Sequence, residues 1–137
     1  MSVPKTQRGE GQLVVITKAE ELAEYTVKIC KNEKHFPKAF RWCFTHKIVD
    51  EAVSIYCLIR EANSIYVYNQ DDFALRRSKQ IEALALTDSL LGLIDLTKRV
   101  YGLEGSRVEH WANLIKDVRN PLRQWRKSDE QRYKDIG

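Results

Sequence analysis

The chain has 137 residues, of which 43% are hydrophobic and 31% are charged, with only six glycines and three prolines. This length predicts one domain with a single core, and the few glycines and prolines argue against an all-β domain, which needs a turn about every eight to twelve residues. The sequence has no apolar run long enough to span a membrane and no signal-peptide stretch near its start. We therefore expect a cytoplasmic protein with no membrane partner.

Residue types that carry enzyme chemistry are scattered. The three cysteines, Cys30, Cys43 and Cys57, are too far apart for a zinc knuckle and too few for a disulfide framework. The sequence also lacks a pair of histidines at i and i+4, a glycine-rich phosphate loop and the Glu-x-x-His pair of a ferritin-type site. We accordingly predict no catalytic residue, no metal and no cofactor.

The N-terminal part is predicted to be separate from the folded domain. Residues 1–12 are polar and lack periodicity, and a short apolar run over residues 13–16 follows. Thr17 and Glu20 then fit a capping box, in which each side chain bonds the backbone N–H of the other residue. We predict a flexible arm over residues 1–16 and an all-α domain over residues 17–137.

Helical periodicity dominates that domain. The first helix is expected to run from Thr17 to about residue 33, and the second over residues 38–68. An aspartate in the connection over residues 69–72 is expected to cap the third helix, which ends at Gly102 in a left-handed C-terminal cap. A second capping box at Ser106 begins the fourth helix.

Each predicted helix has an apolar stripe at spacings of three and four, except that the spacing is looser in the third. In the second helix the stripe runs Phe44, Ile48, Ala52, Ile55, Ile59, Ala62 and Tyr66; in the third it is Leu75, Ile81, Leu84, Leu91, Ile94 and Tyr101; in the fourth it is Val108, Trp111, Ile115, Val118, Leu122 and Trp125. Pro121 is expected to kink or briefly break the fourth helix, and the chain is expected to fray after Ser128. The predicted fold is an up-down-up-down four-helix bundle.

Positive charge is concentrated in one segment. Residues 116–127 hold five basic residues and a single acidic one, and the rest of the chain holds 18 of each sign, so the whole net charge of +4 lies in about three helical turns. The basic residues on one flank of this helix lie about 100° from the apolar stripe. A second cluster lies near the start of the third helix, where cations oppose the helix dipole and another use for them is plausible. The predicted binding residues are Lys116, Arg119, Arg123, Arg126 and Lys127 in the first cluster and Arg76, Arg77 and Lys79 in the second.

Two other interpretations compete with a polyanion-binding surface. Charged helix flanks are often only solvated, and the three tryptophans, Trp42, Trp111 and Trp125, are expected in the core rather than on a surface that stacks bases. Arg41 and His46 have the Arg-x4-His spacing of helical ribonucleases of the HEPN class, but Trp42 replaces the polar residue that usually follows the arginine. A nuclease is therefore the weaker alternative.

Phe36-Pro37-Lys38 with Arg41, followed by a long helix containing residues 52–62, resembles a family of small four-helix-bundle proteins. One branch is encoded in intervening sequences of rRNA genes, and the other is Avd, the accessory variability determinant of diversity-generating retroelements. The segment from Arg119 to Trp125 is similar to the end of the last helix in the Avd branch, and residues 56–62 do not keep the usual motif of the rRNA branch.

The resemblance implies a non-enzymatic accessory factor. Avd-like proteins assemble into homo-oligomeric rings, usually pentamers, and bind the reverse transcriptase and template RNA of the retroelement in support of mutagenic cDNA synthesis. For this chain we expect reverse transcriptase, template RNA or cDNA, and further copies of the chain itself as partners. The alternative from the residues alone is a protein-only scaffold bundle that binds an acidic partner.

Overall fold

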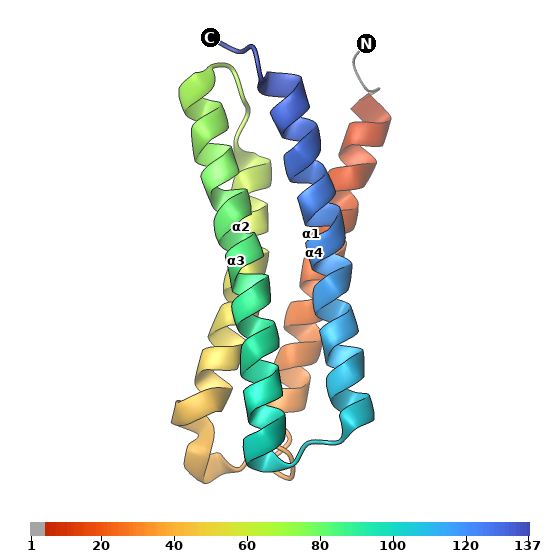
Figure 1. Cartoon of the computed structure of the whole chain (residues 1–137), viewed down its shortest axis with the longest axis vertical. Coiled ribbons are helices and arrows are strands. Elements are labelled where there is room, and N and C mark those ends of the chain that lie inside the picture. Colours follow the sequence, from red (N-terminus) through yellow and green to blue (C-terminus); the bar gives the residue numbers. More distant parts are fainter. Residues whose placement is uncertain (1–4) are drawn as a thin grey trace.

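The computed structural model describes the backbone of residues 5–137 and the side chains of residues 11–137. This range forms an all-α four-helix bundle without strands, as predicted (Figure 1). Consecutive helices run in alternating directions along the long axis in Figure 1, which is compatible with an up-down-up-down topology, and α4 packs against both α3 and α1. The helices are α1 (Lys5–Cys30), α2 (His46–Ser64), α3 (Gln70–Tyr101) and α4 (Gly105–Tyr133), and α2 is preceded by a 3-10 turn, η1 (Lys38–Phe40), and a π-helical turn, η2 (Arg41–Thr45). None of the helices in the described range has an apolar stretch that reaches across a bilayer.

The first helix is longer than predicted. α1 begins at Lys5, so residues 5–16 belong to the helix, and the predicted domain boundary at residue 17 is wrong. Thr17 lies in the middle of α1 and caps nothing, whereas Val15 and Ile16 are buried in the bundle core. The apolar run therefore acts as a helix face and not as an extended arm. Residues 1–4 lie outside the described part of the chain, and the flexibility of the arm stays a prediction.

The second predicted helix is divided at its start and shortened at its end. Residues 38–45 form the turns η1 and η2, and the regular helix α2 begins only at His46. Its C-terminal end is Ser64, because Ile65 adopts extended backbone angles (φ −86°, ψ 114°). Tyr66, predicted to extend the apolar stripe, is 77% exposed instead. The stripe from Ile48 to Ala62 is buried as predicted.

Asn69, and not an aspartate, caps the start of α3. Its side-chain Oδ1 accepts a hydrogen bond from the backbone N–H of Asp72 (2.9 Å), while the Asp72 carboxylate accepts one from the backbone N–H of Tyr68 (3.0 Å). Two N–H groups at the helix start are thereby satisfied. At the other end of α3, Gly102 has the left-handed conformation that was predicted (φ 68°, ψ 39°).

The buried face of α3 is partly polar, and this explains an error in the predicted stripe. Leu75 and Ile81 were expected to face the core but are 52% and 44% exposed. The face that points inward is rotated from them and includes the polar residues Arg76, Gln80, Thr87 and Thr97 alongside apolar ones. Hydrophobic periodicity cannot find a helix face whose polar side chains are buried because they bond Asp129 of α4 or carbonyls of their own helix.

The predicted stripe of α4 is confirmed from Trp111 to Trp125, all five residues being buried. The helix begins at Gly105 with Glu104 as its N-cap, and no side-chain hydrogen bond caps it, so the capping box at Ser106 is wrong. It continues through Pro121 without a break. Nor does the chain fray after Ser128: α4 extends to Tyr133, and Asp129 is fully buried.

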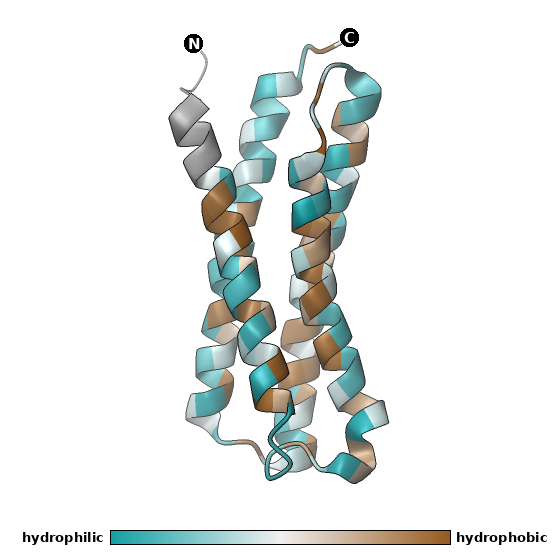
Figure 2. Ribbon diagram, turned by 180° about the vertical axis from the view of Figure 1, so that it is seen from behind, coloured by the Kyte–Doolittle hydropathy of each residue, from teal (hydrophilic) through white to brown (hydrophobic). Residues whose placement is uncertain are grey.

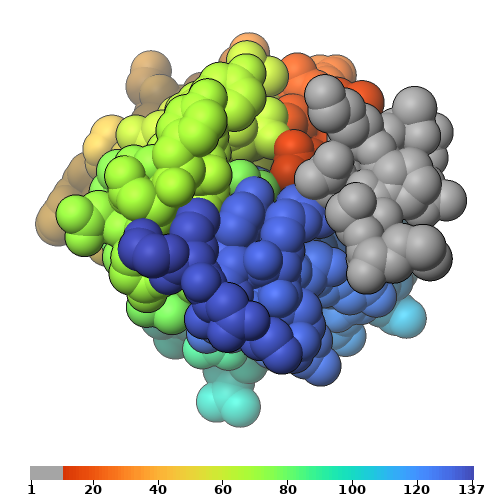
Figure 3. Space-filling view, turned by 90° about the horizontal axis from the view of Figure 1, so that it is seen from above, coloured from red at the N-terminus to blue at the C-terminus, as the bar shows by residue number. Residues whose placement is uncertain are grey.

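The two chain ends of the described range lie near the same end of the bundle as the α2–α3 connection (Figure 1). Seen along the long axis, the last residues of α4 lie beside the start of α3 (Figure 3). A backbone hydrogen bond of 2.7 Å from the Gln70 N–H to the Gly137 carbonyl joins these segments. The C-terminal residues are thus part of the bundle end.

Trp111 is a core residue in the second turn of α4, where this helix packs against α1. It is fully buried, its indole Nε1–H donates a hydrogen bond to the Thr26 hydroxyl (3.0 Å), and its ring packs edge-on against Tyr25 and Phe36. The residue therefore contributes both apolar burial and a satisfied polar contact in a dry environment.

We expect the substitution Trp111→Phe to lower the free energy of unfolding by about 2–4 kcal/mol, because it removes buried volume and leaves the Thr26 hydroxyl without its donor. Urea unfolding followed by circular dichroism measures the loss. The double substitution Trp111→Phe with Thr26→Val should recover part of it. No recovery in the double variant would show that the hydrogen bond contributes little.

Candidate nucleic-acid interface

The basic residues of α4 form one continuous face. Lys116, Arg119 and Arg123 lie one helical turn apart on the same flank, and Arg126 and Lys127 continue it toward the C-terminus. Of these, Lys116, Arg123 and Lys127 are exposed, and Arg119 and Arg126 are half-buried. We call these five residues the α4 cationic face.

The half-buried arginines lie on the side of α4 that faces α3. Glu130 lies one turn beyond Arg126 on the same flank and forms an ion pair with Arg77 of α3 (3.5 Å). This flank of α4 therefore faces α3. The Nε atoms of Arg119 and Arg126 are buried and have no hydrogen-bond partner in the described chain. Their stems are thus covered by the bundle, a common arrangement for arginine.

The cations of the α4 cationic face are not neutralised within the described part of the protein. No ion pair there joins any of the five to a carboxylate, whereas seven other cations of the described chain form such pairs. Asp117 is the one acidic residue within residues 116–127, and it is exposed. It points about 100° away from Lys116 and about 200° away from Arg119 around the helix axis, so it does not lie on this face. The result is a positive surface three turns long.

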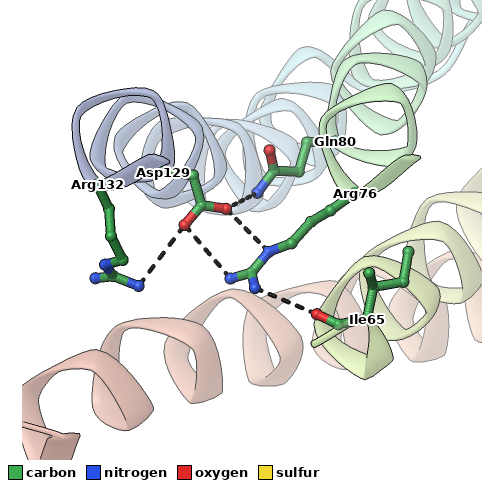
Figure 4. Close-up of polar contacts among 5 residues, drawn as sticks. All are labelled: Ile65, Arg76, Gln80, Asp129 and Arg132. Atoms are coloured by element: carbon green, nitrogen blue, oxygen red, sulfur yellow. Dashed lines mark hydrogen bonds and ion pairs between the residues drawn. The ribbon is translucent and has the colours of Figure 1, made fainter. Parts of the chain in front are cut away.

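Arg76 does not belong to such a surface, and its prediction as a binding residue is wrong. Its guanidinium is buried between α3 and α4, where Nε lies 2.9 Å from the Asp129 carboxylate (Figure 4). It also donates to the Ile65 carbonyl (3.3 Å) and lies over the Trp125 ring at 5.0 Å. Arg76 therefore has a structural role, and its ion pair with Asp129 offsets the unfavourable interaction of a cation with the helix dipole near the start of α3.

Asp129 is the centre of this buried group. Its carboxylate accepts a hydrogen bond from the Gln80 amide (2.9 Å) and lies 3.8 Å from Arg132, in addition to its contacts with Arg76 (Figure 4). Burial raises the pKa of the Asp129 carboxyl above its ordinary value, and the charge of Arg76, the Gln80 amide and Arg132 oppose that rise. A buried carboxylate of this kind needs its partners. This group was not predicted, because residues after 128 were expected to fray.

The remaining predicted residues of the second cluster are half-exposed and paired. Arg77 forms the ion pair with Glu130 and lies over the Phe73 ring at 5.2 Å. Lys79 lies 4.0 Å from Glu61 of α2. These two side chains have carboxylate partners already, so they are less available to an anion than the α4 cationic face is.

The tryptophans divide unequally between core and surface. Trp111 and Trp125 are buried as expected, but Trp42, in the turn η2, is 79% exposed. It is flanked by the exposed residues Arg41 and Cys43. This exposed aromatic side chain was expected in the core, so the prediction for Trp42 is wrong.

Comparisons with known proteins add no relative. No protein-family model matches the sequence, and no curated protein or solved structure matches it either. Among the described residues, no three histidine, cysteine or acidic side chains lie close enough together to hold a metal ion.

Proposed function

We propose that the protein is an Avd-like, non-enzymatic accessory factor that binds a reverse transcriptase and its template RNA and supports mutagenic cDNA synthesis. The observation that carries the proposal is the α4 cationic face, a row of cations without carboxylate partners in the described chain. The resemblance of residues 36–62 and 119–125 to the Avd branch supplies the identity of the partners.

Lysine and arginine side chains in such a row suit the phosphate backbone of a nucleic acid. Phosphate contacts are independent of base sequence and release condensed counterions, so they position a strand without reading it. Arginine offers a planar fork of donors that matches two phosphate oxygens. In this proposal the face holds template RNA, and the polymerase supplies the chemistry.

We further propose that the chain assembles with copies of itself, with a pentamer as the expected state. Several large apolar side chains remain exposed in the single chain, and contacts between subunits would cover them. They lie near the start of α1, where Figure 2 shows a hydrophobic turn beside the grey residues, and on the outside of α3. The residues are Leu13 and Val14 on α1 and Leu75, Ile81, Leu96 and Val100 on α3. Light scattering measures the number of subunits.

A protein-only scaffold that binds an acidic partner is the second candidate. It is favoured by the contacts of α3, where Arg76, Arg77 and Lys79 all meet carboxylates of other helices. An acidic protein surface would present carboxylates to the basic residues of α4 in the same way. Filter binding to structured RNA at low and at moderate salt separates the two candidates, because only the first predicts salt-sensitive retention of RNA.

The accessory role is tested by reconstitution. The proposal predicts that genes beside this one encode a reverse transcriptase together with paired template and variable repeats. With that polymerase and its template RNA, cDNA synthesis should depend on this protein, and the protein alone should neither extend a primer nor cleave RNA. Full cDNA synthesis without the protein would contradict the proposal.

A further inference from the structure

A pocket opens between the end of α1 and the π-helical turn η2, away from the α4 cationic face. It has a volume of about 270 Å³. Val27, Cys30 and Val49 form its apolar part. Burial raises the pKa of the Cys30 thiol to about 12, so this sulfur is uncharged at neutral pH.

The polar part of the pocket is cationic. Lys31, Arg41 and His46 line it, and no acidic residue does. The Arg41 guanidinium lies 3.8 Å from Glu33, but both side chains are more than half exposed, so this ion pair holds the arginine weakly. The two residues that the sequence analysis considered as a nuclease pair, Arg41 and His46, are thus brought to one pocket.

A buried hydroxyl without a partner also lines this pocket. Thr45 is 5% exposed, and its Oγ1 has no hydrogen-bond partner in the described chain. Threonines inside helices usually donate to a carbonyl three or four residues earlier. Thr87 and Thr97 do so here, to the carbonyls of Leu84 (2.6 Å) and Leu93 (2.7 Å).

The π-helical turn accounts for this difference. The backbone N–H of His46 bonds the Arg41 carbonyl five residues earlier, which widens the turn at Thr45. Single π-helical turns of this kind occur frequently at functional sites. The Thr45 hydroxyl therefore has no acceptor within the described chain, and three side chains that can donate to an anion line the same pocket.

We propose that this pocket binds a phosphate group, held by Lys31, Arg41 and His46 at the rim and by the Thr45 hydroxyl as a further donor. A phosphate has several acceptor oxygens and can accept from more than one donor at once, and charge-assisted hydrogen bonds are the strongest of their kind. The volume is below that of most pockets for drug-sized ligands, which favours a small ligand or a single group of a larger one. The phosphate is either free or the terminal group of a nucleotide.

This inference is independent of the proposed accessory function. The α4 cationic face lies on the side of the bundle where α4 meets α3, whereas the pocket is built from the end of α1, the turn η2 and the start of α2. Loss of RNA binding through α4 would leave the pocket unaffected. Conversely, a pocket without phosphate affinity says nothing against the accessory role.

Calorimetric titration with inorganic phosphate, with a nucleoside 5′-monophosphate and with the unphosphorylated nucleoside tests the proposal. Saturable binding of at least one phosphate compound and none of the nucleoside is expected. Tighter binding of the monophosphate than of inorganic phosphate identifies a nucleotide as the source of the group, and the reverse order identifies free phosphate. No saturable binding of either compound in the millimolar range overturns the proposal.

Variants locate the binding. Lys31→Gln with Arg41→Gln should weaken phosphate binding about tenfold or more, since two charge-assisted contacts are lost. Thr45→Val should also weaken it, while Thr45→Ser, which keeps the hydroxyl, should not. The matched control, Lys34→Gln with Lys38→Gln, removes the same charge from exposed residues that do not line the pocket. Equal weakening in the control overturns the proposed site, and thermal unfolding confirms that each variant is folded.

Discussion

Asp129→Ala is expected to be the most destabilising single substitution among the polar residues of the bundle, at a cost of about 3–5 kcal/mol. It leaves the Arg76 guanidinium buried without a carboxylate, with the Ile65 carbonyl and the Trp125 and Tyr133 rings as its remaining partners. Removal of one partner from a buried ion pair exposes the full desolvation cost of the other. In a chain of 137 residues this corresponds to a decrease in Tm on the order of 10–15 °C, measurable by calorimetry.

The neighbouring ion pair provides the matched control. Arg77→Met removes the arginine that follows Arg76 on α3 and breaks its ion pair with Glu130 of α4. Both side chains of this pair are half-exposed, so the expected loss in the free energy of unfolding is only about 0–1 kcal/mol. Equal losses in Asp129→Ala and Arg77→Met would contradict the assignment of Asp129 as a buried charge centre.

A double variant separates the value of the pair from the cost of breaking it. Arg76→Met with Asp129→Leu replaces both charges by apolar side chains of similar size, and such replacements are often neutral or stabilising. We expect most of the stability lost in Asp129→Ala to return. Gln80 and Arg132 lose their acceptor in this variant, so recovery should be incomplete.

The fold class follows from the sequence because three of its four helices bury a face that is mostly apolar. On α4, Trp111, Ile115 and Leu122 recur at spacings that only a helix places on one side, and all are buried. Helix ends were predicted less well. Gly102 was found because its left-handed conformation requires glycine, whereas the capping boxes at Thr17 and Ser106 have suitable residues but lie inside helices.

The candidate site was predictable in part, for a related reason. The α4 cationic face follows from residue spacing alone, because the stripe beside it fixes which flank remains outside. The burial of Arg76 does not follow from residue spacing, because it depends on Asp129, 53 residues later in the chain. The pocket at Thr45 depends on a π-helical turn, and sequence periodicity does not predict such a turn.

Reversal of the exposed charges on α4 is expected to abolish most RNA binding without loss of the fold. Lys116→Glu, Arg123→Glu and Lys127→Glu together replace three exposed cations. Arg119 and Arg126 are left unchanged because their buried Nε atoms connect them to the packing of the bundle. Circular dichroism should therefore give the helicity and unfolding midpoint of the unmodified protein within a few degrees.

The affinity for structured RNA should fall on the order of a hundredfold at low salt, because each lost contact between a cation and a phosphate also removes the favourable release of a condensed counterion. The slope of log affinity against log salt concentration should become shallower by about two to three, which corresponds to three lost contacts at about 0.7–0.9 each. Filter binding at several salt concentrations measures both quantities.

A control with the same net charge distinguishes a local site from a general effect of charge. Lys34→Glu, Lys38→Glu and Lys47→Glu change the net charge by the same amount on exposed residues outside α4. Under the proposed function this variant keeps most of its affinity and a salt slope near that of the unmodified protein, because phosphate contacts act within about a Debye length. If both triple variants lose affinity equally, RNA is attracted by the overall charge of the molecule and the α4 cationic face is not its binding site. If the α4 variant loses RNA but still binds the reverse transcriptase, the two partners occupy different faces of the bundle.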